Sequence, residues 1–394
     1  MKMLKLLGYD TQEITRLGGI HTAREICQQP KLWQEILESI QSSKKEIQEF
    51  ISKVEENVDA IILTGAGTSA YVGMAVEGFF HNSLKKTTLS VPTTHLVTHP
   101  ADYFSKNNNI LLVSFARSGN SPESKAAVTL ADHFSKTCHH LIITCNSDGD
   151  LAKMPVKNNR YIYHLPEKSN DKSLAMTSSF SGMLLAGLLI ADIDNIENHH
   201  TAVNLLSESV ENFLQNGIHD LSEIAAKDFD RAVFLGSGPL YGIAKEAQLK
   251  MQELTDGIVV GKYDSFLGLR HGPKAVINNK TLICFHFSND RYVLNYEEDL
   301  VNSINSASNP IVQLGISTSQ SSTVKLDWNI NLNLPSSEIA EGFLAVASIV
   351  PAQVLAFFKS IHLGLSPDSP SRNGAISRVV QGVNIYEIQN KIEA

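Results

Sequence analysis

The chain repeats itself at a fixed distance, and this repeat restricts its possible folds more than any other feature. Gly65 and Gly67 recur as Gly236 and Gly238, 171 residues later. In both places a short apolar run precedes the glycines and a helical stretch follows them. Further apolar runs match in order at nearly the same offset: 110–114 with 281–285, 141–144 with 311–314, 162–166 with 330–335, and 177–191 with 339–358. We therefore predict a tandem duplication of one unit.

The repeated unit alternates continuous apolar runs with helical stretches, which predicts an α/β fold. Strands without polar alternation are typical of a parallel sheet that helices cover on both faces. Leu32, Ile36, Ile40, Ile47 and Ile51 recur at helical spacing ahead of the first strand. The predicted divisions are an N-terminal helical arm (1–47), a first α/β domain (48–197), a helical linker (198–226), a second α/β domain (227–365) and a C-terminal tail (366–394).

Composition restricts the class of ligand and the compartment. The 394 residues include 33 Lys and Arg against 41 Asp and Glu, a formal net charge of −8. This balance disfavours binding to nucleic acid or to an anionic membrane surface. Four scattered cysteines without a CxxC pair argue against a zinc ribbon or a disulfide framework and suit a reducing compartment. Because we identify no signal peptide and no apolar run of membrane-spanning length, we expect a soluble cytoplasmic protein with a small ligand.

The first glycine loop, Gly65 to Ser69, stands where a strand gives way to a helix. Glycines such as Gly67 let an anion approach the backbone, free N–H groups at the helix start bind it, and Thr68 and Ser69 add hydroxyl donors. A tight turn with a capping serine explains the loop equally well. A dinucleotide site is disfavoured because the acidic residue expected about 20 positions later is missing from 85–91.

A second loop strengthens the case for an anion. Arg117, Ser118, Gly119 and Ser121 follow the run 110–115, and we expect their donors at the same sheet edge as the first loop. Two hydroxyl-rich loops with a cation suit a phosphate monoester, although a polar turn with a helix cap remains an alternative for this loop alone. The corresponding stretch 286–290 lacks the Ser-Gly pattern, so only the first half is expected to bind phosphate.

These motifs resemble those of the sugar-isomerase (SIS) domain, a phosphosugar-binding module. Residues 117–124, 265–274 and 378–383 resemble the AgaS-type phosphosugar isomerase/deaminase family along the whole chain. The resemblance implies two tandem SIS domains, no cofactor and a phosphosugar substrate. It also implies conversion of galactosamine 6-phosphate to tagatose 6-phosphate and ammonia. The alternatives are a tagatose-6-phosphate ketose/aldose isomerase without deamination and a phosphosugar sensor without catalysis.

The isomerase half of glucosamine-6-phosphate synthase is a more distant resemblance, and it implies catalytic roles. Its Glu-x-x-x-Lys-x-x-Glu pattern matches Glu246, Lys250 and Glu253, and its His-Gly-Pro matches 271–273. By this resemblance Glu253 moves a proton between C1 and C2, and His271 assists ring opening from a partner subunit, which implies at least a dimer. Glu246 and Lys250 support them. From spacing alone, the three residues share one helix face and could equally form a solvated salt-bridge stripe, and a lone histidine is more often structural.

Two departures from the synthase argue against amination. No glutaminase domain precedes the first strand, and Ile376 or Arg378 falls near the synthase lysine that forms a Schiff base. A guanidinium stays protonated and does not act as that nucleophile. We therefore expect isomerisation or deamination.

Other candidate groups are assigned no chemistry. His95 and His99 lack a third metal ligand, and the pairs 139–140 and 199–200 are interpreted as exposed. Cys145 and Cys284 are interpreted as small core residues. Since a positioned base moves a C2 proton without a metal, no metal site is predicted.

Overall fold

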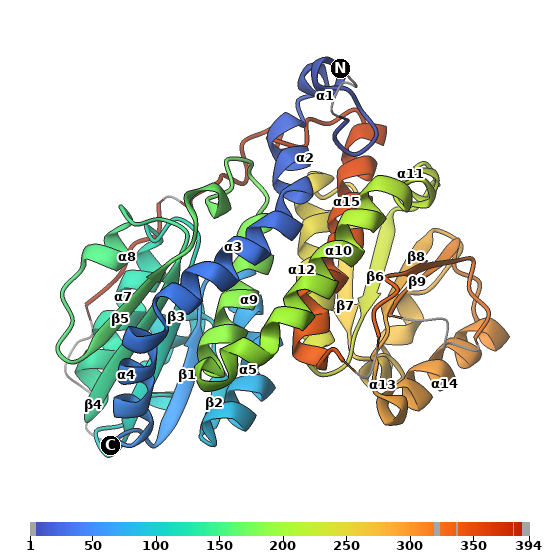
Figure 1. Cartoon of the computed structure of the whole chain (residues 1–394). Coiled ribbons are helices and arrows are strands. Elements are labelled where there is room, and N and C mark those ends of the chain that lie inside the picture. The colour runs from blue at the N-terminus through green and yellow to red at the C-terminus, as the bar shows by residue number, and fades with distance from the viewer. Residues whose placement is uncertain (1–4, 319–323, 336–337, 381, 388–394) are drawn as a thin grey trace.

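The computed structural model describes residues 5–318, 324–335, 338–380 and 382–387, and it confirms the duplicated α/β architecture (Figure 1). The first four residues of the predicted arm, the last seven of the predicted tail and the short stretches 319–323, 336–337 and 381 lie outside the described residues. Each half contains one five-stranded sheet in which every neighbouring pair is parallel.

The two sheets have the same strand order, β2-β1-β3-β4-β5 and β7-β6-β8-β9-β10. The strands of the first sheet are β1 (Ala60–Thr64), β2 (Thr87–Ser90), β3 (Asn109–Ala116), β4 (Thr137–Thr144) and β5 (Arg160–His164). Those of the second are β6 (Arg231–Leu235), β7 (Val260–Asp264), β8 (Thr281–His286), β9 (Val312–Ser317) and β10 (Trp328–Asn331). In each sheet the second strand in sequence lies on one side of the first strand, and the remaining three strands follow on its other side. The strand order therefore reverses between β1 and β3 in the first sheet and between β6 and β8 in the second. Ligands of open α/β sheets bind outside the carboxyl ends of strands at such switch points.

Four helices, two from each half, fill the space between the sheets. They are α5 (Thr68–Leu84), α9 (Ser178–Ala191), α12 (Pro239–Leu254) and α15 (Glu341–His362). Helices α5 and α12 run antiparallel and approach closely, since a Cβ placed on Gly242 would lie 2.8 Å from the backbone nitrogen of Ala75. This contact brings the last two turns of α12 beside the first turn of α5.

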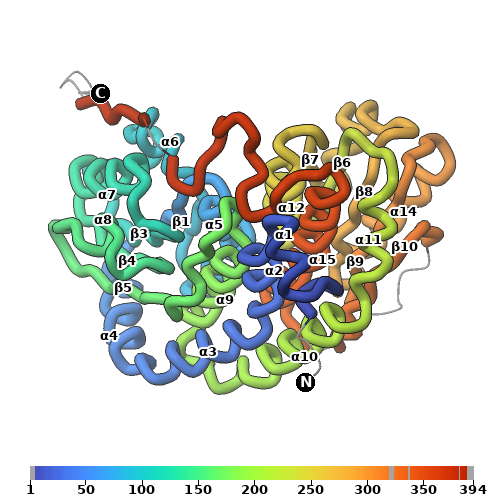
Figure 2. The backbone as a smooth tube through the Cα atoms, turned by 90° about the horizontal axis from the view of Figure 1, so that it is seen from above, coloured from blue at the N-terminus to red at the C-terminus, as the bar shows by residue number. Residues whose placement is uncertain are grey.

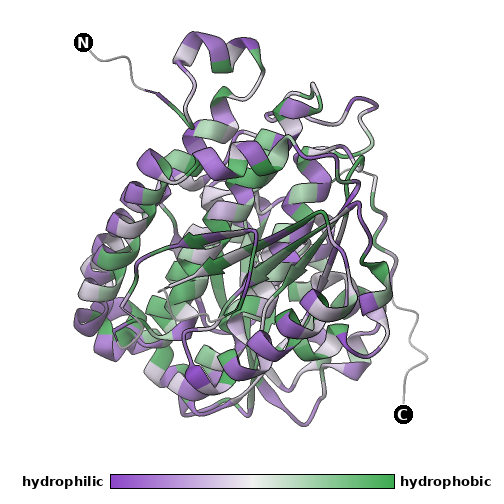
Figure 3. Ribbon diagram, turned by 90° about the vertical axis from the view of Figure 1, so that its right-hand side faces the viewer, coloured by the Kyte–Doolittle hydropathy of each residue, from purple (hydrophilic) through white to green (hydrophobic). Residues whose placement is uncertain are grey.

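Helix α15 is long and apolar enough to cross a membrane, but 94% of its most apolar 18-residue stretch is buried inside the protein. It packs against α12, α9 and α11 (His219–Ala225), which explains its uniform apolarity. The outer helices are amphipathic, and Figure 3 shows the hydrophobic strands inside them. The remaining helical elements of the two halves are α6 (Thr93–Thr98), η1 (Pro100–Asp102), α7 (Pro122–Phe134), α8 (Asp150–Lys153), η2 (Glu167–Ser169), α13 (Phe266–Leu269), η4 (Pro273–Val276) and α14 (Arg291–Ala307).

The predicted N-terminal arm is helical, but it packs onto the domains. Its helices are α1 (Thr11–Arg16), α2 (Ile20–Cys27), α3 (Gln29–Ser42) and α4 (Lys44–Glu55), and the linker contains η3 (Ile193–His199), α10 (His200–Asn216) and α11 (His219–Ala225). Leu32, Ile36, Ile40 and Ile47 are fully buried, as their spacing predicts. Helix α3 lies against α9 and α10, where Trp33 Nε1 donates a hydrogen bond of 3.0 Å to Ser181 Oγ.

The C-terminal tail has no helix or strand in its described parts, 366–380 and 382–387. It leaves α15, crosses the top of the molecule and reaches the first domain near α6 (Figure 2). It is fixed at its start by Asp368, whose carboxylate accepts hydrogen bonds from the backbone nitrogens of His21 and Thr22 at the beginning of α2.

The interpretation of the pairs 139–140 and 199–200 as exposed is wrong. His139 and His140 lie on β4, a central strand, and are 7% and 0% exposed, while His199 is half-buried and stacks on Phe343. His140, Asp132 and Cys138 place three possible metal-ligand atoms within 4.8 Å. However, Asp132 Oδ1 lies 3.0 Å from Nε2 of His140, whereas Cys138 Sγ lies 4.0 Å from Nδ1. Asp132 and Cys138 thus lie at different nitrogens of the His140 ring. This arrangement favours a hydrogen bond between Asp132 and His140 over a metal site with three ligands.

Candidate active site

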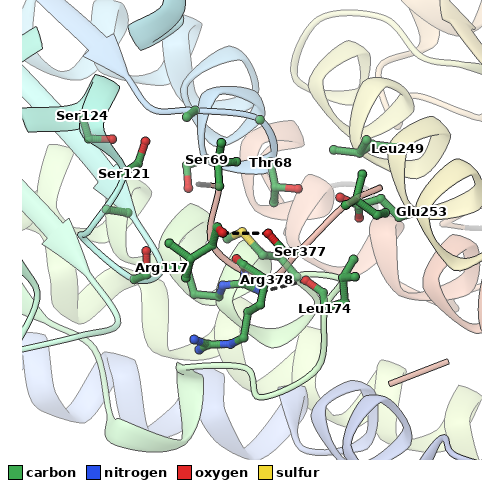
Figure 4. Close-up of a pocket in the computed structure, with 18 of the residues that line it drawn as sticks. Thr68, Ser69, Arg117, Ser121, Ser124, Leu174, Leu249, Glu253, Ser377 and Arg378 are labelled. Carbon is green, nitrogen blue, oxygen red and sulfur yellow. Dashed lines mark hydrogen bonds between the residues drawn. The ribbon is translucent and has the colours of Figure 1, made fainter. Parts of the chain in front are cut away.

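A pocket of about 570 Å³ opens at the switch point of the first sheet, outside the carboxyl ends of β1 and β3. All seven residues predicted to hold the phosphate line it, together with the predicted base Glu253 (Figure 4). In Figure 4, Ser121 lies on one side of the pocket and Glu253 on the opposite side, with Thr68 and Ser69 between them. The pocket therefore combines residues from both halves of the chain.

The first glycine loop positions the N-terminus of α5 at this pocket. Gly67 adopts φ 55° and ψ −127°, a conformation that favours glycine, and Gly238 in the second half repeats it with φ 53° and ψ −127°. Gly65 allows close packing, because a Cβ there would lie 2.5 Å from the backbone of Ser69. Thr68 and Ser69, in the first turn of α5, are 4% and 5% exposed. The backbone nitrogens of Ser69 and Ala70 donate to the carbonyl oxygens of Ala66 (3.1 Å) and Gly67 (2.9 Å), so the positive end of the helix dipole and the two hydroxyl groups are what suits an anion here.

The second loop connects β3 to α7 along the neighbouring wall. Gly119 adopts φ 66°, and a Cβ there would lie 3.3 Å from the Cα of Gly149. Ser118 accepts a hydrogen bond of 3.3 Å from the backbone nitrogen of Asn120, and Ser121 occupies the N-cap position of α7. The Ser121 hydroxyl donates to Glu123 Oε2 at 2.7 Å. Hydroxyl groups of the two loops thus line one pocket, as the sequence predicts.

Arg117 lines the pocket, but the hydrogen bonds of its guanidinium run to backbone carbonyls. Nη1 donates to the carbonyl oxygens of Leu174 (3.0 Å) and Ser173 (3.4 Å), and Nη2 donates to that of Arg378. The residue is 7% exposed, and burial lowers the pKa of its side chain. A direct contact between Arg117 and phosphate remains a prediction, whereas the contact with the tail is part of the structure.

The three charged residues of α12 form a buried network rather than a solvated stripe. Lys250 Nζ lies 2.5 Å from Glu253 Oε2 and 3.2 Å from Glu246 Oε1. It also donates to Thr68 Oγ1 at 3.2 Å, and that hydroxyl donates to Glu246 at 3.2 Å. The side chains of Lys250 and Glu246 are fully buried, and that of Glu253 is 22% exposed on the pocket side. Thr68 thus connects the phosphate loop of one repeat to the charged face of the other.

The single positive charge of Lys250 cannot neutralise two carboxylates, and the burial of Glu246 decides which of the two holds a proton. Burial raises the pKa of Glu246 to about 8, and the adjacent Lys250 only partly offsets this. Burial alone would lower the pKa of Lys250, but the two carboxylates outweigh it and raise the pKa. Glu246 Oε2 has no hydrogen-bond partner among the described residues, which suits a neutral carboxyl group. The cation is then available to Glu253.

Glu246→Gln should make the stability less dependent on pH. Between about pH 4.5 and 8 the folded state holds a proton on Glu246 that the unfolded state releases, so the free energy of unfolding falls as pH rises, by about 1.4 kcal/mol per unit from this group. The glutamine cannot titrate and removes this contribution. Urea unfolding at pH 5.5, 6.5 and 7.5 measures the slope, with the exposed Glu223→Gln as control. An unchanged slope in Glu246→Gln would mean that Glu246 is ionised in the folded protein.

His271 does not line this pocket within the described chain. It is exposed, one residue beyond the C-cap of α13, and is followed by Gly272 with φ 111°. Gly272 takes a positive φ that favours glycine, and Pro273 restricts the backbone that follows it, so both residues limit the freedom of this loop. A role for His271 in the pocket, reached from a second copy of the chain, remains a prediction.

The equivalent crevice in the second half is filled by carboxyl groups. A Cβ on Gly238 would lie 3.4 Å from Glu341 Oε2, and Ser288 Oγ donates to the same carboxyl group. The backbone nitrogen of Ser288 donates to Glu297 at 2.9 Å, and burial raises the pKa of Glu297 to about 7. Acidic side chains at this position disfavour a phosphate, which supports the prediction that only the first half binds one.

Several pocket residues were missed from the sequence. Ser124 lies one turn after Ser121 on α7, and this spacing could have revealed it. Leu249 precedes Lys250, whereas Leu174 and Met176 come from an irregular segment without a motif. The tail residues 374–380 form one wall. Of these, only Ile376 and Arg378 were indicated, by the resemblance to the synthase. No local pattern in the sequence indicates this return of the chain.

Comparison with known proteins identifies the architecture. The model of the SIS domain matches residues 56–192 and 226–362, one copy in each half. The chain belongs to the SIS-domain family. It is 39% identical over 380 residues to a D-galactosamine-6-phosphate deaminase AgaS of Shewanella, covering 95% of this chain and 94% of that protein. The AgaS-type resemblance is therefore confirmed.

Solved structures agree over nearly the full length. A tagatose-6-phosphate ketose/aldose isomerase from Escherichia coli has a TM-score of 0.85 at 34% identity and covers 94% of this chain and 98% of its own. A Clostridium novyi protein, provisionally described as the same kind of isomerase, has a TM-score of 0.94 at 40% identity and covers 98% and 100%. The two-domain arrangement with its tail is thus shared with proteins described as phosphosugar isomerases.

Proposed function

We propose that this chain is a phosphosugar isomerase/deaminase that converts galactosamine 6-phosphate and water to tagatose 6-phosphate and ammonia. The observation that carries the proposal is the shared pocket, in which Glu253 faces two loops suited to a phosphate monoester. A phosphate held at Ser69, Ser118 and Ser121 would anchor C6 and leave C1 and C2 near the carboxylate. The AgaS relative, described as a galactosamine-6-phosphate deaminase, supports the choice of amino sugar.

The reaction requires one base that acts on two carbons. After ring opening, Glu253 would remove the C2 proton while the aldehyde oxygen is protonated, which gives an enolamine. The same carboxyl group would return the proton to C1, which leaves an imine at C2. Water then adds to C2 and ammonia leaves, so the product is the ketose. Lys250 would position Glu253 through the 2.5 Å ion pair, and a positioned base of this kind accelerates proton transfer by about 10²–10⁴-fold.

The walls of the pocket support deamination over amination. None of the described residues that line it is a lysine, so a Schiff base with the sugar has no nucleophile there. Arg378 does line the pocket, but its guanidinium donates to the carbonyl oxygen of Asp171 at 2.8 Å and to Asn170 Oδ1 at 2.6 Å. It therefore holds the chain and does not replace the lysine.

The assay that tests the function measures ammonia release from hexosamine 6-phosphates, with glucosamine 6-phosphate as the epimer control. Ammonia from galactosamine 6-phosphate supports the proposal. Conversion between tagatose 6-phosphate and its aldose without ammonia would instead assign the isomerase activity. The E. coli protein of similar structure is described as an isomerase of this kind. Tight binding of a phosphosugar without turnover would assign a sensor.

We further propose that the active enzyme is at least a homodimer in which His271 reaches the pocket of a partner subunit. The exposure of His271 and its absence from the pocket of its own chain support this. Mixing inactive Glu253→Gln and His271→Ala proteins under conditions of subunit exchange should restore up to about a quarter of the wild-type activity by statistical pairing. No recovery, with exchange verified by mass, would mean that both residues act within one chain.

Four cysteines without a disulfide and a phosphorylated substrate favour the cytoplasm as the location of this enzyme. Proton transfer to and from Glu253 accounts for the reaction without a metal or an organic cofactor.

A further inference from the structure

Arg117 stands inside the loop that is expected to hold phosphate, yet its side chain is engaged elsewhere. The guanidinium carries five N–H donors in a rigid fork. Three hydrogen bonds run to the carbonyl oxygens of Ser173, Leu174 and Arg378. Two of these acceptors belong to the segment that precedes α9, and the third belongs to the C-terminal tail. One side chain therefore joins three parts of the chain that are far apart in sequence.

The segment that receives Arg117 is itself firmly held. Asp171 caps α9 through hydrogen bonds from the backbone nitrogens of Thr177 (2.8 Å) and Ser179 (2.9 Å). Glu25 of α2 accepts a hydrogen bond of 2.6 Å from the backbone nitrogen of Lys172. This segment, residues 170–174, is called the platform below. Because the platform is fixed by two helices, it can anchor a mobile partner.

The tail contacts the platform at two points that enclose its pocket-lining part. At the first, the backbone nitrogen of Leu174 donates to the carbonyl oxygen of Asp368 at 3.0 Å. At the second, the Arg378 side chain donates to Asp171 and Asn170, and Arg117 binds the Arg378 carbonyl oxygen. Between them, residues 374–380 form the wall opposite the glycine loop (Figure 4). The described tail has no helix or strand to hold this wall. The backbone nitrogen of Arg372 also donates to Asp256 at 3.2 Å, but the contacts at the platform are the ones that flank the wall.

We propose that Arg117 is a positioning residue that latches the C-terminal tail over the active-site pocket, and that the phosphate is bound by hydroxyl and backbone N–H groups without it. The latch couples the phosphate loop to the wall, because Arg117 lies directly before Ser118. A sugar in the pocket is then enclosed by the tail on the side opposite the glycine loop. The substrate named here rests on the proposed function, but the latch itself does not.

The test compares Arg117→Ala with wild-type protein by limited trypsin digestion, and mass spectrometry measures the cut after Arg378. Loss of hydrogen bonds from a charged donor should increase the population of the released tail and accelerate this cut about tenfold or more. Calorimetry with inorganic phosphate measures the anion site separately, and its Kd should stay within about threefold. The matched control is Arg372→Ala, because Arg372 is an exposed tail residue that donates to Leu363 and lies outside the pocket lining. It should change neither quantity.

A second variant covers the case in which Arg117→Ala does not fold. Arg117→Lys keeps the charge but loses the fork, so the cut should still be faster while phosphate affinity is kept. An unchanged cutting rate would overturn the latch. A loss of phosphate affinity of tenfold or more, with or without a faster cut, would overturn the assignment of Arg117 away from the phosphate. Ammonia release by the wild-type enzyme tests the proposed function independently of all three outcomes.

Discussion

Glu253→Gln should reduce turnover by about 10²–10⁴-fold while the affinity for the phosphosugar stays within about threefold. The amide is nearly isosteric with the carboxylate, so the pocket keeps its shape and the two phosphate loops are untouched. It cannot accept the C2 proton, and the contribution of a general base is therefore lost. Exchange of the C2 hydrogen with deuterated solvent, followed by NMR, isolates this step from ring opening and from hydrolysis of the imine.

The control for this variant is Glu223→Gln, because Glu223 is an exposed glutamate of α11 that does not belong to the pocket lining. It should leave both exchange and ammonia release unchanged. Substantial C2 exchange in Glu253→Gln would mean that another group is the base. A tenfold loss of affinity with normal turnover would instead assign Glu253 to substrate binding.

Lys250→Met should lower the free energy of unfolding by about 3–5 kcal/mol and abolish activity. The lysine is fully buried between two carboxylates, and breaking a buried ion pair from one side leaves charge without a partner in the interior. Glu246 is already protonated at neutral pH, so the charge left without a partner is that of Glu253, which must turn toward solvent, away from its place beside the sugar. Urea denaturation measures the first effect and ammonia release the second, with Lys45→Met on the surface of α4 as control.

A double variant separates stability from catalysis. Lys250→Met combined with Glu246→Leu replaces the buried pair by apolar groups of similar size, which is often neutral or stabilising. It should recover most of the lost stability but none of the activity, because Glu253 still lacks its cation. If activity returns with stability, Lys250 serves the fold alone and the positioning role is wrong.

The duplication and the first-half phosphate loops could be predicted because they depend on local patterns. Glycines at fixed spacing after apolar runs specify strand, turn and helix without knowledge of the rest of the chain. The exact residue-by-residue match between the strands of the two repeats was harder to predict. The sequence match pairs 141–144 with 311–314, whereas the sheets make Leu141 equivalent to Leu314, since Leu141 lies beside Val113 and Leu314 beside Cys284. Runs that are apolar on both faces carry no two-residue period to fix such a match.

The network around Lys250 shows the same limit for the site. Spacing placed Glu246, Lys250 and Glu253 on one face of a helix, but it did not show whether that face meets water or α5. Burial against Thr68 depends on a helix 178 residues earlier than Glu246, and only the packing of the two repeats reveals it. The interpretation of His139 and His140 as exposed residues was wrong for a related reason. Two polar residues within an apolar run do not show whether their strand lies inside the sheet.

The antiparallel contact of α5 and α12 places the glycine loops of the first repeat and Glu253 of the second at one pocket. Under the proposed function, one copy supplies the anion site and the other supplies the proton-transfer group, so neither copy would be an enzyme by itself. A chain cut between the halves would have to reassociate through α5 and α12 before any substrate could react.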